Sequence, residues 1–101
     1  MRCNEEVPLV KGVYERYRKE GLVVIGIGIQ DTEKNIRMFA EKLGMPWPVG
    51  LDKGGTISKL YGITFGAGIV FIDRDGIIKG RYITAFTREE LEEKVEAILL
   101  K

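Results

Sequence analysis

The chain has no histidine, one cysteine and one tryptophan among its 101 residues. Without histidine it cannot perform Cys-His or Ser-His-Asp catalysis, and a metal site would lack the commonest transition-metal ligand. One cysteine excludes an internal disulfide and a cysteine-based zinc site. An enzyme made of this chain alone would therefore work through its thiol, carboxylates or tyrosines, and we expect no metal and no cofactor.

The chain also lacks an excess of either charge and any long hydrophobic run. Sixteen basic residues nearly balance fifteen acidic ones, so no overall field attracts nucleic acid. No apolar run approaches the roughly 18 residues of a membrane-spanning helix, and no signal-peptide pattern is visible. As it stands the sequence predicts a cytoplasmic protein with a single domain, residues 1–101, and a modest core.

The first half of the chain alternates helix and strand signals. Apolar residues recur at helical spacing over residues 5–20; Gly21 would end this helix, and Pro8 would fall in its first turn. Residues 22–29 form a nearly continuous apolar, β-branched run, which predicts a strand buried on both faces of a parallel sheet. Tyr14 and Tyr17 lie on the apolar helix face, so we expect them in the core.

A second helix and an extended segment follow. Asp31 or Thr32 would cap the helix, and Gly44 would end it. The two prolines within residues 45–49 force extended backbone there and put Trp47 at the rim or edge of the core. One or two helical turns are predicted for residues 56–61.

The last part of the chain predicts a hairpin and a helix. Residues 69–73 and 77–83 are strands joined by an Asp-Gly turn. Thr87 and Glu90 form a capping box for a final amphipathic helix. Its apolar stripe comprises Leu91, Val95, Ile98 and Leu99. The predicted order is therefore α-β-α-(short α)-β-β-α.

Residues 3–8, Cys-Asn-Glu-Glu-Val-Pro, resemble the second half of a Trp-Cys-x-x-Cys-x-x-Glu-x-Pro signature. That signature belongs to thioredoxin-like thiol–disulfide oxidoreductases of the TlpA/ResA type, which are related to the AhpC/TSA group. Residues 48–52, 61–63 and 71–76 are similar to further motifs of this family, in the same order. The resemblance implies a thioredoxin-like three-layer α/β sandwich and protein thiols or disulfides as partners.

The same resemblance assigns two site residues. Cys3 corresponds to the buried, resolving cysteine, and Glu6 to the acidic residue that modulates ionisation of the thiol. The nucleophilic cysteine would fall one position before Met1, so the chain begins inside its own Cys-x-x-Cys motif. If the true N-terminus is longer, it could carry an export signal, so export stays an alternative to a cytoplasmic location.

Two departures from the family pattern fall on the expected active site. The nucleophilic cysteine is absent from residues 1–101, and Ala67 stands where the family has a cis-proline. A cis bond before a non-proline residue costs about 3–4 kcal/mol, so we expect a trans peptide and a reshaped loop. Gly66, Ala67 and Gly68 then form either a substrate-binding loop or a simple turn. Both departures argue against ordinary catalysis.

The family's first core strand is also missing, and in the family it lies between the strands equivalent to residues 22–29 and 69–73. Its absence would leave two unpaired strand edges, which proteins avoid. The two strands could pair directly with each other, another chain could pair with their open edges, or the true chain could be longer. If residues 1–101 are the whole protein, we predict a homodimer.

Three functions remain open from the sequence. The first is a thiol–disulfide oxidoreductase, or a truncated form of one. The second is a non-catalytic thioredoxin-like interaction module. The third is a peroxiredoxin-like peroxidase working through a sulfenic acid on Cys3. Dinucleotide binding is disfavoured, because Gly26-x-Gly28 lies inside the strand and lacks a third glycine.

Overall fold

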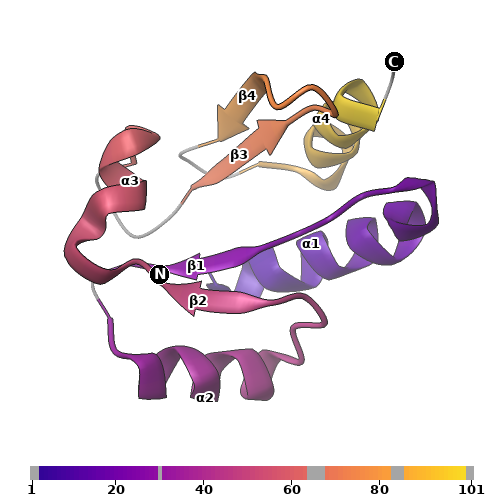
Figure 1. Ribbon diagram of the computed structural model, residues 1–101. Coiled ribbons are helices and arrows are strands. Elements are labelled where there is room, and N and C mark those ends of the chain that lie inside the picture. Colours follow the sequence, from indigo (N-terminus) through magenta and orange to yellow (C-terminus); the bar gives the residue numbers. More distant parts are fainter. Residues whose placement is uncertain (1–2, 30, 64–67, 83–85, 100–101) are drawn as a thin grey trace.

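The computed structural model describes residues 3–29, 31–63, 68–82 and 86–99, with side chains from Glu6 onward (Figure 1). The helices are α1 (Cys3–Tyr17), η1 (Arg18–Glu20), α2 (Glu33–Leu43), η2 (Lys53–Gly55), α3 (Thr56–Leu60) and α4 (Arg88–Leu99). The strands are β1 (Gly26–Gly28), β2 (Val49–Leu51), β3 (Ile69–Ile72) and β4 (Ile78–Tyr82). The predicted order is confirmed, with two elements added between α2 and α3, namely β2 and η2.

Local signals set most of the helix ends. Gly21 follows η1 with φ +105°, and Gly44 ends α2 with φ +62°, a region that glycine enters at little cost. Thr32 caps α2 by accepting a hydrogen bond from the Asn35 N–H at 3.1 Å. The prediction for Pro8 was wrong: α1 already begins at Cys3, so this proline lies beyond the first turn. There it removes one helical hydrogen bond.

The capping box of α4 is confirmed in both directions. The backbone N–H of Glu90 donates to Thr87 Oγ1 at 3.1 Å, and the backbone N–H of Thr87 donates to Glu90 Oε1 at 2.8 Å. Two donors that the helix itself cannot satisfy are thereby paired.

Within the described residues the strands form two separate two-stranded sheets. In one, β1 and β2 are parallel, with Gly26 opposite Val49 and Gly28 opposite Leu51. In the other, β3 and β4 are antiparallel, with a register shift after Phe71. Figure 1 shows β1 and β3 as the neighbouring strands of the two sheets. They have therefore not closed up into one sheet.

The prediction that residues 22–29 are buried on both faces was wrong. Only Gly26–Gly28 is a strand, and alternate side chains face solvent: Val23 is 75% exposed, Ile25 65% and Ile27 45%. Composition alone indicated double burial, but burial depends on neighbours, and among the described residues β1 has a neighbouring strand on one edge only.

The core lies where α1 and α4 pack on the β3–β4 hairpin. Its buried side chains are Val13, Tyr17, Phe71, Leu91 and Val95. Tyr17 is in this core as predicted, whereas Tyr14 is half-buried and meets the Trp47 ring edge-on at 5.7 Å. Trp47 is itself buried, at 7% exposure, so it belongs to the core edge.

Close packing explains the two glycines of β1. A Cβ on Gly28 would lie 2.1 Å from Ile36 Cδ1 of α2, and one on Gly26 would lie 2.9 Å from Val49 Cγ1. Glycine therefore lets α2 and β2 approach the strand closely.

Candidate functional site

Cys3 is the first residue of α1, at the end where unpaired backbone N–H groups gather. The positive end of the helix dipole favours an anion at such a position, which is the general reason for a reactive thiol to sit there. The side chain of Cys3 lies outside the described part of the chain.

Glu6 follows three residues later, so it lies on the same side of α1 as Cys3. Its side chain is half-buried, and the neighbouring Val7 is buried at 9% exposure. An ionised carboxylate one turn from the thiol raises the free-energy cost of forming a thiolate by charge repulsion, and protonation of the carboxylate removes that cost.

The far end of α1 is held by α4. The Tyr17 hydroxyl donates to Glu96 Oε2 at 2.5 Å, and this bond, together with burial, raises the pKa of Tyr17. Arg16 pairs with Glu92 at 3.2 Å, and Arg88 of α4 reaches the same carboxylate at 3.1 Å. These contacts fix the direction of the helix that carries Cys3.

A second set of contacts ties α1 to α2. The Lys11 ammonium donates to the Leu43 carbonyl at 3.4 Å, in the last turn of α2. A cation there also complements the negative end of the α2 dipole. The helix that begins at Cys3 is therefore attached to both flanking helices.

The predicted glycine loop is described only at its last residue. Gly66 and Ala67 lie outside the described residues, so the trans peptide expected at Ala67 is untested. Gly68 directly precedes β3 and is exposed; a Cβ there would lie 3.1 Å from Ile63 Cδ1.

Sequence reasoning gave no role to Asp52, which is 5% exposed and links β2 to α3. Its carboxylate accepts the N–H groups of Ile57 at 3.0 Å and Ser58 at 2.8 Å. Those two bonds lower its pKa, because they favour the charged form. An aspartate four residues before Thr56, where α3 begins, was the available signal. Its role is to anchor this short helix.

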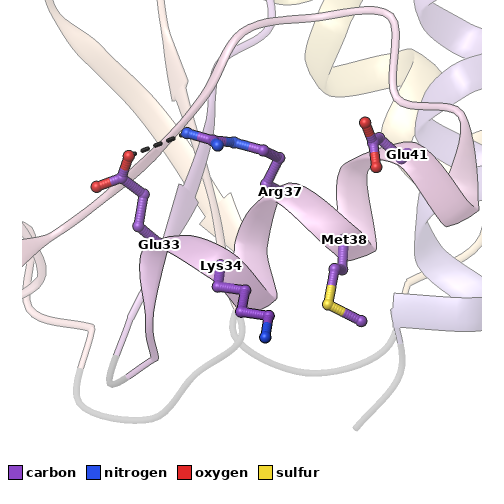
Figure 2. Close-up of a pocket in the computed structure, with 5 residues that line it drawn as sticks. All are labelled: Glu33, Lys34, Arg37, Met38 and Glu41. Carbon is purple, nitrogen blue, oxygen red and sulfur yellow. Dashed lines mark hydrogen bonds and ion pairs between the residues drawn. The ribbon is translucent and has the colours of Figure 1, made fainter.

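Two surface hollows lie against α2. The larger, about 640 Å³, runs between α2 and β2 and includes Ile36, Ala40, Val49 and Leu51 in its lining. Figure 2 shows the smaller, about 210 Å³, whose lining residues all belong to α2 and include the Glu33–Arg37 ion pair at 3.1 Å. Neither contains a predicted site residue. Across residues 3–29, 31–63, 68–82 and 86–99 we find no acidic or cysteine cluster that could hold a metal, and no helix long and apolar enough to cross a membrane.

The AhpC/TSA family model matches residues 1–81. The chain belongs to the AhpC/TSA family. Thiol-disulfide oxidoreductase ResA of Bacillus thuringiensis subsp. konkukian is 30% identical over 96 residues, which are 95% of this chain and 56% of that protein. ResA of Geobacillus thermodenitrificans is 25% identical, covering 95% and 55%. The chain spans little more than half of these AhpC/TSA relatives.

Solved structures give the fold of this AhpC/TSA member. A thiol:disulfide interchange protein of the thioredoxin family from Chlorobium tepidum TLS matches with a TM-score of 0.80 at 20% identity, over 96% of this chain and 70% of that one. A secreted Mycobacterium tuberculosis disulfide oxidoreductase, described as homologous to E. coli DsbE, matches with a TM-score of 0.81 at 22% identity, over 94% and 71%. The thioredoxin-like α/β fold predicted from the sequence is confirmed.

Proposed function

We propose that this domain carries out thiol–disulfide exchange on protein substrates, with Cys3 as the resolving cysteine and Glu6 as the group that assists its proton transfer. The observation that carries the proposal is the place of Cys3 at the start of α1, within the segment that matches the AhpC/TSA model. The ResA relatives, named as thiol-disulfide oxidoreductases, support the reaction class.

Exchange needs two thiols. A nucleophilic thiolate attacks one sulfur of the substrate disulfide, forms a mixed disulfide and releases one substrate thiolate. The Cys3 thiolate then attacks the domain's sulfur in that mixed disulfide and releases the second substrate thiol. The substrate gains two electrons, and the domain is left with one internal disulfide. Residues 1–101 supply one of these two thiols.

The nucleophilic thiol belongs, in this proposal, to a residue directly before Met1, and the first core strand precedes it. The separate sheets and the exposed row Val23, Ile25 and Ile27 support a domain that lacks one strand. We further propose that the loop at Gly66, Ala67 and Gly68 contacts the substrate, and that residues 1–101 alone form a homodimer that covers the exposed row.

A second candidate function is a non-catalytic interaction module. The observation that favours it is the exposed apolar row of Val23, Ile25 and Ile27, which leads into β1, because contiguous exposed apolar side chains mark interaction sites. This function needs no second thiol.

Insulin reduction and peroxide consumption by residues 1–101, and by the polypeptide extended N-terminally, test the proposal. We expect turnover of insulin only in the extended form, with loss of turnover in Cys3→Ser. Glu6→Gln should shift the pH profile of the rate, whereas Glu33→Gln, on the exposed face of α2, should leave it unchanged. Turnover that survives Cys3→Ser would refute the thiol mechanism, and extended protein with no turnover would favour the interaction module.

A further inference from the structure

Within the described residues β2 is paired along one edge only, with β1. The two residues that flank β2 hydrogen-bond to β1: the Pro48 carbonyl accepts at 2.9 Å and the Asp52 N–H donates at 2.8 Å. Because the backbone groups of successive strand residues point to opposite edges, those of Val49 and Leu51 point away from β1. β2 therefore presents an open edge that carries unpaired N–H and C=O groups.

The helix α2 lies beside this open edge. Figure 1 shows α2 on the side of β2 that faces away from β1, and running in the opposite direction to β2. Between them is the larger hollow of about 640 Å³, here called the α2–β2 hollow. Its apolar lining consists of half-buried side chains, namely Ile36, Ala40, Val49 and Leu51. Its volume lies within the range of protein ligand pockets, roughly 300–1,000 Å³.

The α2–β2 hollow thus joins two kinds of surface. One is apolar, and the other offers backbone donors and acceptors that repeat every second residue, about 7 Å apart. An extended peptide matches both, because its own backbone pairs with a strand edge while alternate side chains enter a pocket beside it. A compact small molecule matches only one of the two.

Charged side chains stand at the two ends of the hollow. Lys53 lies just beyond the end of β2, and Glu41 lies in the last turns of α2, which places it toward the start of β2. Both are exposed, and neither has an ion pair within the described part of the chain. The other two charges of the lining, Glu33 and Arg37, neutralise each other at 3.1 Å (Figure 2). The hollow therefore favours a ligand with an acidic group at one end and a basic group at the other.

We infer that the α2–β2 hollow binds an extended segment of a protein partner, which adds to the open edge of β2 as a strand. The segment carries apolar side chains at alternate positions, an acidic residue beside Lys53 and a basic residue beside Glu41. A second copy of this chain fits less well, because α2 lies along the same edge and two copies would bring their α2 helices together. The inference does not depend on Cys3 or on the proposed function, since neither Cys3 nor Glu6 lines the hollow.

Hydrogen exchange of residues 1–101 with a probe peptide tests the inference. The probe is a blocked seven-residue peptide, Lys-Val-Thr-Val-Thr-Val-Glu. At saturation we expect protection of the Val49 and Leu51 amides to rise at least about ten-fold, because each gains a partner, while the Ile72 amide of β3 stays unchanged. The same peptide with proline as its central residue should give no protection. Equal protection by both peptides, or none by the first at millimolar concentration, would overturn the inference.

Charge reversal supplies a second readout. Lys53→Glu should weaken binding of the probe about two- to five-fold, the worth of an exposed ion pair, and replacing the glutamate of the probe by lysine should restore binding to this variant. Lys59→Glu, on the exposed surface of α3 and outside the hollow, is the matched control and should change nothing. Equal effects of the two reversals would contradict the placement of the segment. Protection of the Val49 and Leu51 amides that rises with protein concentration, without peptide, would identify a second copy as the occupant and overturn the inference.

Discussion

Replacing Leu91 by alanine tests whether α4 holds α1 through the core. Leu91 is 3% exposed and packs with Val13, Tyr17 and Phe71. Buried leucine-to-alanine changes cost about 3 kcal/mol or more, from the lost transfer free energy and the cavity left behind. Because small domains have a total stability of about 5–15 kcal/mol, this is a large fraction. At roughly 4–8 °C per kcal/mol, Tm should fall by about 12–24 °C.

The assay is urea and thermal unfolding followed by far-UV circular dichroism, with Leu60→Ala as the matched control. Leu60 is 79% exposed on α3, so its truncation should change the unfolding free energy by less than about 0.5 kcal/mol. Equal losses for the two leucines would refute the placement of the core between α1, α4 and the β3–β4 hairpin.

Three further predictions concern single residues. Gly28→Ala should cost about 1–3 kcal/mol in urea unfolding, because its Cβ would lie 2.1 Å from Ile36 Cδ1, and the second change Ile36→Val should restore part of the loss. Because the pKa of Asp52 is lowered in the folded state, its contribution to the free energy of unfolding is fully present above the unfolded carboxyl pKa of about 3.9 and is lost as pH falls through the lower folded-state pKa. Asp52→Asn should therefore reduce stability at neutral pH and make stability fall less steeply in acid. An unchanged pH dependence of stability in acid would count against Asp52 as the anchor of α3. Thr87→Ala should cost about 1 kcal/mol by removing the cap of α4, whereas Thr87→Ser should cost little.

Local chemistry made much of the fold predictable. Gly21, Gly44 and the Thr87 capping box are signals that act within a few residues, and the structure places helix ends at each. The Asp-Gly turn likewise predicted the β3–β4 hairpin, in which Gly76 has φ +81°.

What the sequence could not supply depends on contacts between distant residues. The run at residues 22–29 has the composition of a doubly buried strand, but burial depends on neighbours that composition does not show. Asp52 was missed because its two backbone partners come from α3, where the short sequence gives only a weak helical pattern. Of the candidate site, Cys3 and Glu6 were predicted through family motifs and stay predictions, since no periodicity marks a thiol as reactive.

The most direct test of the central claim is trapping of a mixed disulfide. The N-terminally extended protein, with Cys3→Ser, is mixed with a disulfide-containing protein substrate and run on a non-reducing gel. If Cys3 is the resolving thiol, the variant should accumulate a covalent complex that dithiothreitol releases, while the unsubstituted protein turns over without accumulating it. Equal turnover by both proteins, with no complex in either, would contradict the assignment of Cys3.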